Sequence, residues 1–245
     1  MHVHPTYTRF FTRMIFITGD KHSEFHSVRD FCRKWNTRRE DVLIVLGDAG
    51  INYFQDARDV ELKQQLARLP ITLFCIHGNH ELRPERLPGY QSQEAFGGTV
   101  FVEPDYPNLL FPEDGALYQI GTQKTLVIGG AYSVDKYLRL KRRWHWFEDE
   151  QPSEAIKART ERALEAAQWQ VDTVLSHTCP SSQVPVEKVS PLASEYGTID
   201  TSTEDWLETI RQRLTFNRWY AGHFHVDYCR DQFTFLFENF SLFDI

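Results

Sequence analysis

Three short apolar runs of the chain each lead directly into a loop of glycine and polar residues. They occupy residues 14–18, 42–46 and 71–76, and their aliphatic and β-branched side chains predict buried strands. The segments between them, residues 25–35 and 56–69, are predicted to be helices. Strands that alternate with helices indicate parallel βαβ units, so this part of the chain is predicted to have an α/β fold.

The middle of the chain has a different pattern. Residues 99–102, 117–120 and 125–128 lie close together, separated by Pro, Asp and Gly, and they predict an antiparallel meander. Residues 152–169 have one apolar face and predict a helix with Pro152 in its first turn. The apolar residues 171–176 follow as another expected strand.

The last part of the chain predicts one more helix and two strands. Thr201-Ser202-Thr203-Glu204 has the form of a capping box that opens a helix, and residues 217–221 and 233–238 are the last expected strands. Residues 178–200 are rich in Pro and Ser and form either a surface excursion or a loop over the site. No repeat or linker divides the chain, so we expect a leader over residues 1–13 and a single domain over residues 14–245.

Composition limits the classes of protein that the chain can belong to. With 41% hydrophobic and 25% charged residues it resembles ordinary globular proteins, and its apolar runs are too short to span a bilayer. The first residues lack the features of a secretory signal, so we expect a cytoplasmic protein without membrane contact. The 4 cysteines have no paired spacing and are expected to be reduced. A net charge of −7 argues against a protein that mainly holds long nucleic acid.

Polar motifs follow the expected strands at five places. They are Gly19-Asp20-Lys21-His22, Gly47-Asp48, Gly78-Asn79-His80-Glu81, His177 and Ala221-Gly222-His223-Phe224-His225. Each motif is weak alone, because a Gly-Asp pair after a strand is most often a turn and a lone histidine is most often structural. Ligands collect at the carboxyl ends of parallel strands, so the set as a whole predicts one site.

The residue types in these motifs favour divalent metal ions. Asp20 and His22 are two residues apart, a spacing that sends both side chains to the same side of an extended backbone, and His223 and His225 repeat it. Oxygen and imidazole ligands suit hard and borderline divalent ions. Asp48 has two carboxylate oxygens and could bridge two ions. The predicted chemistry is a pair of ions that holds a phosphate ester and attacks it with a metal-bound hydroxide.

With these motifs the chain resembles the calcineurin-like metallophosphoesterases, whose pattern is Asp-x-His, Gly-Asp, Gly-Asn-His-Asp/Glu, His and Gly-His-x-His. The resemblance spans residues 20 to 225. It implies a four-layer α/β/β/α sandwich of two mixed β-sheets flanked by helices. It also implies one metal held by Asp20, His22, Asp48 and His225, a second held by Asp48, Asn79, His177 and His223, and His80 as the group that protonates the leaving oxygen or steadies the phosphoryl group.

The chain departs from some relatives at the positions after Asp48. Protein serine/threonine phosphatases and dinucleoside-tetraphosphatases carry Asp and Arg there, whereas this chain has Ile51 and Asn52. The chain is therefore closer to the phosphodiesterase-type branches. Another basic residue is needed at the substrate, and the candidates are Arg83, Lys136 and Arg139. The alternative for the basic stretch after residue 135 is a solvated face.

The resulting hypothesis is a binuclear metal-dependent phosphoesterase that acts on a phosphodiester or phosphomonoester of a small nucleotide-like molecule. Manganese is the metal that we expect first, and iron, zinc and nickel suit the same ligands. A metal-dependent DNA or RNA nuclease is the alternative, and a non-catalytic protein-binding scaffold is a third. The sequence leaves the substrate, the native metal and the oligomeric state open.

Overall fold

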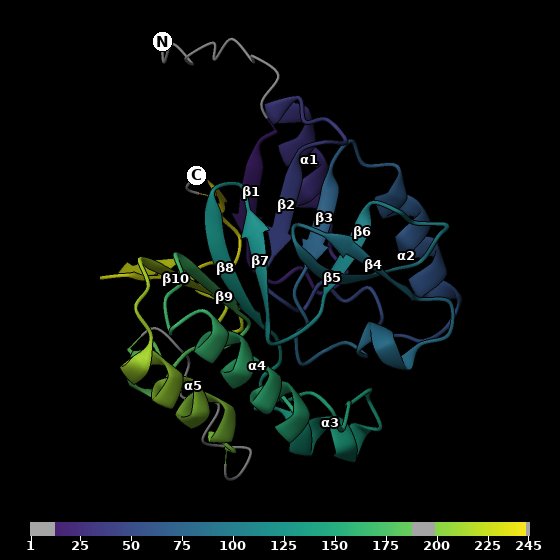
Figure 1. Ribbon diagram of the computed structural model, residues 1–245. Helices are drawn as coiled ribbons and strands as arrows, with labels where there is room; N and C mark the ends of the chain where they lie inside the picture. The colour runs from purple at the N-terminus through teal and green to yellow at the C-terminus, as the bar shows by residue number, and fades with distance from the viewer. Residues whose placement is uncertain (1–12, 188–198, 244–245) are drawn as a thin grey trace.

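Two β-sheets pack face to face between outer helices in the computed structural model, which describes residues 13–187 and 199–243 (Figure 1). The strands of one sheet are β1 (Ile15–Thr18), β2 (Val42–Val45), β3 (Thr72–Cys75), β4 (Gln91–Ala95), β5 (Gly98–Val102), β6 (Leu109–Pro112) and β13 (Phe240–Leu242). Those of the other are β7 (Ala116–Ile120), β8 (Gln123–Ile128), β9 (Thr173–Ser176), β10 (Arg218–Ala221), β11 (Tyr228–Arg230) and β12 (Phe233–Phe235).

The helices cover the outer faces of the two sheets. They are α1 (His26–Trp35), α2 (Ala57–Ala67), α3 (Lys136–Arg142), α4 (Glu154–Ala166) and α5 (Ser202–Arg213), with short 3-10 helices at Pro84–Arg86 and Ser181–Gln183. Helices α1 and α2 lie over the first sheet, and α4 and α5 lie over the second (Figure 1). The expected four-layer α/β/β/α sandwich is confirmed. Within the described residues, every helix is too short or too polar to cross a membrane.

Both sheets are mixed, with a parallel centre. The first has the order β13-β1-β2-β3-β6-β5-β4, and its strands β1, β2, β3 and β6 run parallel to one another. The second has the order β11-β12-β10-β9-β8-β7, with β12, β10, β9 and β8 parallel. Because parallel strands end at the same edge of their sheet, each sheet presents several loops together at one edge.

Alternating side chains of the strands divide between the inner and outer layers. Ile15 and Ile17 of β1 join the cluster between the two sheets, whereas Phe16 points to the helical side. Phe16 packs edge-on against Phe31 of α1, with ring centroids 4.8 Å apart. This period of two explains why the central strands are apolar on both faces and appear in the sequence as continuous runs.

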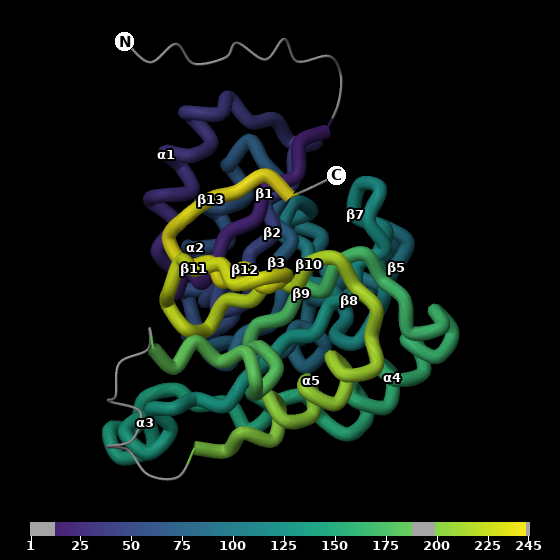
Figure 2. The backbone as a smooth tube through the Cα atoms, turned by 90° about the vertical axis from the view of Figure 1, so that its left-hand side faces the viewer, coloured from purple at the N-terminus to yellow at the C-terminus, as the bar shows by residue number. Residues whose placement is uncertain are grey.

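Helix α3 differs from the other helices. None of its residues is buried, whereas each of the other α-helices has buried residues. In two views related by a quarter turn it lies at the end of the molecule away from α1 (Figures 1 and 2). The helix follows the loop after β8, and that loop starts at the same sheet edge as the loops after β9 and β10.

The predicted meander is confirmed only for its last two strands. Strand β5 pairs with β4 and β6 in the first sheet, whereas β7 and β8 form an antiparallel hairpin in the second. Val100 of β5 and Tyr118 of β7 belong to the same core cluster, which lies between the sheets. Strands β5 and β7 therefore pack against each other through side chains instead of pairing through backbone hydrogen bonds. The prediction assumed that segments close in sequence pair in one sheet.

The two predicted helix starts also need correction. The carboxylate of Asp200, and not a capping box, accepts from the Ser202 amide (2.9 Å) at the start of α5. Glu204 instead accepts a hydrogen bond from the hydroxyl of Thr178 at 2.7 Å, which ties α5 to the loop after β9. Helix α4 begins after Ser153, whose hydroxyl caps it, so that Pro152 precedes the helix.

Some predictions concern residues outside the described part of the chain. The expected leader, residues 1–13, is described at residue 13 alone. Of residues 178–200, whose relation to the site was left open, residues 188–198 also lie outside it. The 4 cysteines are free thiols, as expected, and three of them, Cys32, Cys75 and Cys179, are buried.

Candidate metal centre

The polar motifs meet where the carboxyl ends of the parallel strands of the two sheets come together. Asp20, Asp48 and Asn79 lie in the loops after β1, β2 and β3 of the first sheet, and His177 and His223 lie after β9 and β10 of the second. Ionic and hydrogen-bond contacts connect the two sets directly, since His177 lies close to Asp48 and the His223 amide donates to Asp20. The centre is thus built at an interface between layers and depends on both sheets.

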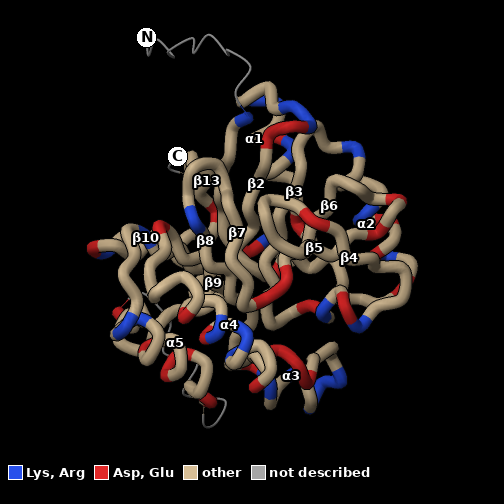
Figure 3. Tube along the Cα trace, in the orientation of Figure 1, with Lys and Arg blue, Asp and Glu red and all other residues tan. Residues whose placement is uncertain are grey.

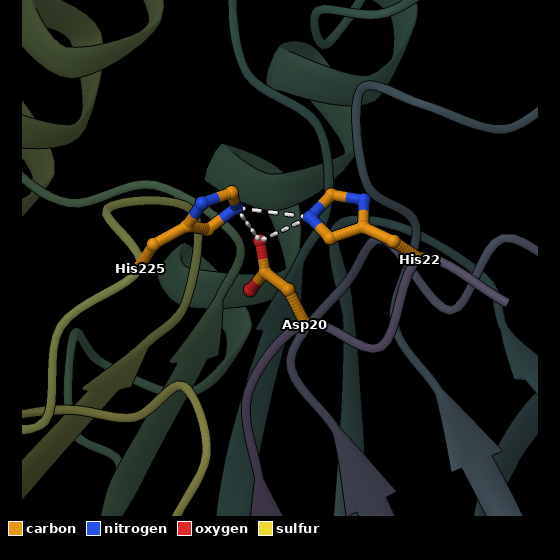
Figure 4. A group of neighbouring side chains, drawn as sticks. All are labelled: Asp20, His22 and His225. Atoms are coloured by element: carbon orange, nitrogen blue, oxygen red, sulfur yellow. Dashed lines mark hydrogen bonds and ion pairs between the residues drawn. The ribbon is translucent and has the colours of Figure 1, made fainter. Parts of the chain in front are cut away.

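Asp20, His22 and His225 form one group of converging side chains (Figure 4). The Nε2 atoms of the two imidazoles are 2.9 Å apart, and Oδ2 of Asp20 is 3.4 Å from His225 Nε2 and 3.8 Å from His22 Nε2. The Asp20 side chain is fully buried, yet its Oδ2 atom has no hydrogen-bond partner among the described residues. A buried carboxylate oxygen without a partner is costly unless a cation or solvent compensates it.

Asp48 lies at the middle of the centre. Its Oδ2 atom is 3.8 Å from Nδ1 of His22, 3.7 Å from Nε2 of His177 and 3.9 Å from Nε2 of His80. Its Oδ1 atom accepts a hydrogen bond from the His80 amide at 2.8 Å. One carboxylate therefore faces three imidazoles that come from three different loops.

His177 and Asn79 are held in orientations that leave their ligand atoms facing each other. Nδ1 of His177 is 2.7 Å from the carbonyl oxygen of Leu46, and the Asn79 amide nitrogen donates to the hydroxyl of Ser133 at 2.9 Å. In the neutral ring, the Nε2 lone pair of His177 then faces Oδ1 of Asn79 at 2.8 Å. A cation that binds both of these acceptor atoms would stabilise them at this short distance.

Left-handed backbone conformations are concentrated in the motif loops. His22, Asp48, His223 and His225 have φ values of 45°, 47°, 65° and 52°. A non-glycine residue rarely adopts such values, and each costs on the order of 1–3 kcal/mol. Four of the seven expected ligands therefore sit in strained turns, and the observation supports a functional role for the loops that carry them.

Glycines allow the loops to approach closely. A Cβ atom at Gly47 would lie 2.1 Å from the imidazole Nδ1 of His177, and Gly47 also has a φ of +93°. At Gly222 it would lie 2.4 Å from Oδ1 of Asp20, and at Gly78 2.0 Å from Oδ1 of Asp48. Each of these glycines stands against a ligand that comes from another loop, so a side chain there would push the ligands apart.

Glu81 ties two of the loops together. Its two carboxylate oxygens accept from the Gly50 amide at 2.9 Å and from the Gly78 amide at 3.0 Å, and the residue is buried. Burial and the nearby charge of Asp48 raise the pKa of Glu81 to about 7. The carboxylate thus fixes the Asp48 loop relative to the Asn79 loop without itself entering the group of expected ligands.

The two central carboxylates have opposite pKa shifts. Burial, followed by the negative charge of Asp20, raises the pKa of Asp48 well above its usual range. Burial also acts to raise the pKa of Asp20, but the contact with His225 and the nearby imidazoles outweigh it, so the pKa of Asp20 is lowered. Two buried carboxylates so close together disfavour a second negative charge, and a divalent cation reverses that preference.

Most imidazoles of the centre are held neutral. Burial is the main cause that lowers the pKa of His22 to about 4 and that of His223 to about 3. Burial and then the charge of Arg139 lower the pKa of His80 to about 2. The contact with the Asp20 carboxylate raises the pKa of His225. Neutral imidazoles are the form that coordinates metals, so His22 and His223 need to lose no proton at neutral pH.

These donors fit divalent metal ions. Two overlapping groups, Asp20 with His22 and His225, and Asp20 with Asp48 and His177, have ligand atoms within 4.8 Å of one another. Nitrogen and oxygen donors without sulfur suit manganese, iron, zinc and nickel alike. The partnerless oxygen of Asp20 and the facing acceptors of His177 and Asn79 are features of the protein that bound cations would resolve.

The three candidate substrate contacts have different surroundings. Arg83 is buried and forms an ion pair with Asp114, and its Nε donates to the Asp149 carbonyl oxygen at 3.2 Å. The ammonium of Lys136 lies 4.1 Å from the centre of the Trp146 ring. Arg139 alone of the three contacts a motif residue, His80. A substrate contact stays a prediction for all three, and the geometry favours Arg139.

Several residues that shape the centre are not apparent from the motifs. Glu81 is part of a motif, but its bonds to two loops depend on a contact between residues 31 positions apart. Ser133 orients Asn79 from a distance of 54 positions, out of the loop after β8. The glycine pair before that loop, Gly129-Gly130, is the sequence signal that could have indicated a sixth loop at the site.

Comparison with known proteins agrees with this arrangement. The model of one protein family, described as calcineurin-like phosphoesterase, matches residues 14–227. The match covers most of the chain and includes all seven expected ligands and His80. No curated protein matches the chain.

Proposed function

Because this chain belongs to the calcineurin-like phosphoesterases, we propose that it is a hydrolase that cleaves a phosphate ester with the help of two divalent metal ions. The observation that carries the proposal is the position of Asp48. Its Oδ2 atom lies within 3.9 Å of imidazole nitrogens from His22, His80 and His177, at the meeting point of two sheets. Such a carboxylate can coordinate two ions at once.

The ligand sets of the two ions are part of the proposal. One set is Asp20, His22, Asp48 and His225, and the other is Asp48, Asn79, His177 and His223. When bound, the ions supply positive charge that neutralises phosphoryl oxygens and activates water for attack. Manganese is the proposed metal, and iron, zinc and nickel suit the same donors.

The surrounding residues prepare these donors. The Leu46 carbonyl holds Nδ1 of His177, so the Nε2 lone pair faces inward, and Ser133 turns the oxygen of Asn79 toward it. A hydrogen bond to the side-chain atom that faces away from the metal fixes the tautomer and the orientation of a ligand. His80 has 17% of its side chain exposed and borders the Asp48 carboxylate, so it can reach a bound ester. Because burial and the charge of Arg139 lower the pKa of His80 to about 2, its imidazole is neutral, and we assign it the role of steadying the phosphoryl group through a hydrogen bond.

A hydrolysis assay tests these roles. Asp48→Asn and His80→Ala should each lose at least about 100-fold of the manganese-stimulated hydrolysis of bis-p-nitrophenyl phosphate. Asp30→Asn and His26→Ala, which replace exposed side chains of α1, are matched controls and should keep wild-type rates. Full activity of a folded Asp48→Asn variant would refute the assignment, and absence of hydrolysis in the wild type would favour a protein-binding scaffold.

We propose a small nucleotide-like phosphodiester or phosphomonoester as the substrate and the cytoplasm as the location. The net charge of −7 does not favour a long polyanion, and acidic and basic residues alternate over the described trace without a large region of one sign (Figure 3). A panel of nucleotides, cyclic nucleotides and phosphodiesters, each offered with each metal, would identify the substrate.

A nuclease is the second candidate, and helix α3 is the observation that favours it. Tyr137 and Trp144 are 61% and 46% exposed, with Lys141 and Arg142 beside their rings. Exposed aromatic rings next to cations are typical of surfaces that bind single-stranded nucleic acid. Incubation of labelled single-stranded DNA with the protein and manganese distinguishes the candidates, because only a nuclease shortens the strand.

A further inference from the structure

One guanidinium group enters the metal centre from the six-stranded sheet's side. Arg139 belongs to α3, yet its side chain is only 12% exposed, because it turns away from solvent toward the loops of the centre. Its Nη2 atom is 3.2 Å from Nε2 of His80. No residue of the helix that carries it is fully buried, and this inward arginine connects the helix to the site.

The rest of the guanidinium is fixed from behind. Nε donates to Oδ1 of Asp135 at 2.7 Å, and Nη1 donates to the hydroxyl of Tyr53 and to the His145 carbonyl oxygen, both at 3.2 Å. These contacts use the Nε hydrogen and both Nη1 hydrogens, which leaves the two Nη2 hydrogens on the side of His80. One of them contacts His80, which leaves the other available to a further acceptor.

Other basic residues near the centre are occupied elsewhere. The ammonium of Lys21 donates to the backbone oxygens of Asp20 and Phe237, at 3.1 Å and 2.8 Å. Ile51 and Asn52, the positions after Asp48, are buried and carry no charge. Arg139, in contrast, contacts a side chain of the centre, His80, through its Nη2 atom.

The contact with His80 is one that an anion can replace. An arginine side chain has donors and no acceptor, so Nε2 of His80 accepts from the guanidinium as an unprotonated nitrogen. A phosphoryl oxygen carries negative charge and is a stronger acceptor than a neutral imidazole. It also matches the planar donors of an arginine better than those of a lysine.

We propose that Arg139 binds a phosphoryl oxygen of the substrate at the His80 edge of the metal centre, and that Asp135 and Tyr53 position its guanidinium for this task. The assignment of a phosphoryl group to this edge rests on the proposed phosphoesterase function. Helix α3 is then the element that completes the substrate site, and Arg139 is a specificity-determining residue for the phosphorylated group.

Binding of inorganic phosphate tests the proposal without requiring turnover. Calorimetric titration of the manganese-loaded protein should show the phosphate dissociation constant rising about 10- to 100-fold in Arg139→Ala, the effect of losing a hydrogen bond to a charged group. Arg139→Lys keeps the charge and should weaken binding less. Arg33→Ala, which removes an exposed arginine of α1, is the matched control and should bind phosphate as the wild type does.

The variants also separate the proposed role from a structural one. Asp135→Asn should weaken phosphate binding by about 3- to 10-fold at unchanged metal content, because it releases the guanidinium without removing it. In hydrolysis assays the Michaelis constant should rise in Arg139→Ala, and added guanidinium should restore part of the activity. A merely structural residue would not produce rescue by guanidinium.

The outcomes distinguish this proposal from the function on which it rests. A folded, metal-loaded Arg139→Ala protein that binds phosphate like the wild type overturns the proposal while leaving the phosphoesterase assignment intact. If Arg139→Ala does not fold, unchanged phosphate affinity in Arg139→Lys overturns it instead. A wild type that binds phosphate through Arg139 but hydrolyses no ester supports the proposal and contradicts the function, and a wild type that binds no phosphate overturns both.

Discussion

At the scale of single residues, the side chains of the centre disfavour two neighbouring negative charges. Asp20 and Asp48 are both buried, and their pKa values shift in opposite directions because a second charge beside the first is disfavoured. His225 gains a proton more readily than a free histidine because it contacts the Asp20 carboxylate. Protons on Asp48 and His225 therefore compensate negative charge that a divalent ion would otherwise compensate.

Metal binding should consequently release protons. The pKa values of Asp48 and His225 are both raised, and the metal requires the deprotonated form of each, so apparent metal affinity should increase as the pH rises. Calorimetric titration with manganese at pH 7, repeated in buffers of different ionisation enthalpy, measures the protons released. A binding heat that does not depend on the buffer would contradict this picture of the two side chains.

Glu81 should affect metal affinity without being a ligand. In Glu81→Gln one of the two amides, of Gly50 or Gly78, would face an NH₂ group instead of an acceptor. We expect manganese affinity to fall by about 10- to 100-fold, as for other groups that support ligands. Equilibrium dialysis measures the change, and Glu94→Gln on the exposed strand β4 is the control. Equal affinity in both variants would mean that the link between the loops is unimportant.

At the scale of elements, the positions at which the strands end determine where the site forms. The loops after β1, β2 and β3 and those after β9 and β10 were predictable, because each strand is a compact apolar run followed by a polar motif. Strand β4 was not, since its side chains are mostly exposed, and β13 pairs with β1 across more than 200 positions. Such pairings depend on the assembled sheet and leave no local pattern.

The same distinction applies to the residues of the centre. The seven expected ligands come together in space as the motifs indicated, because parallel strands bring their ends to one edge. The contact of Arg139 with His80 joins residues 59 positions apart and arises from the course of the loop after β8. The basic stretch therefore indicated charge but could not say which of its residues faces inward.

A pair of glycine variants tests the turn after β2. Gly47 and Gly97 both have positive φ, so alanine at either position should cost on the order of 1–3 kcal/mol of unfolding free energy. Only at Gly47 would the new Cβ atom collide with His177, at 2.1 Å, whereas at Gly97 the nearest atom is 3.8 Å away. Gly47→Ala should therefore lose manganese binding and Gly97→Ala should keep it, as measured by dialysis and urea unfolding. Retained metal binding in Gly47→Ala would show that this close approach is dispensable.

At the scale of the whole molecule, each expected ligand set takes residues from the loops of both sheets, so the candidate metal centre lies at their common boundary. The core between the sheets contains Ile17 and Ile44 from one side and Leu175 and Tyr220 from the other, so it fixes the relative position of the motif loops. Bound ions would then join the two sheets as well as the loops, and the preformed donors reduce the rearrangement that binding requires.

Anomalous diffraction at the manganese edge, from crystals soaked in the metal, tests the central claim most directly. The account predicts two manganese peaks in each molecule, both in contact with the Asp48 carboxylate, one also with Asp20, His22 and His225 and the other also with Asn79, His177 and His223. A single peak, or peaks bound by other residues with Asp48 left free, would contradict it.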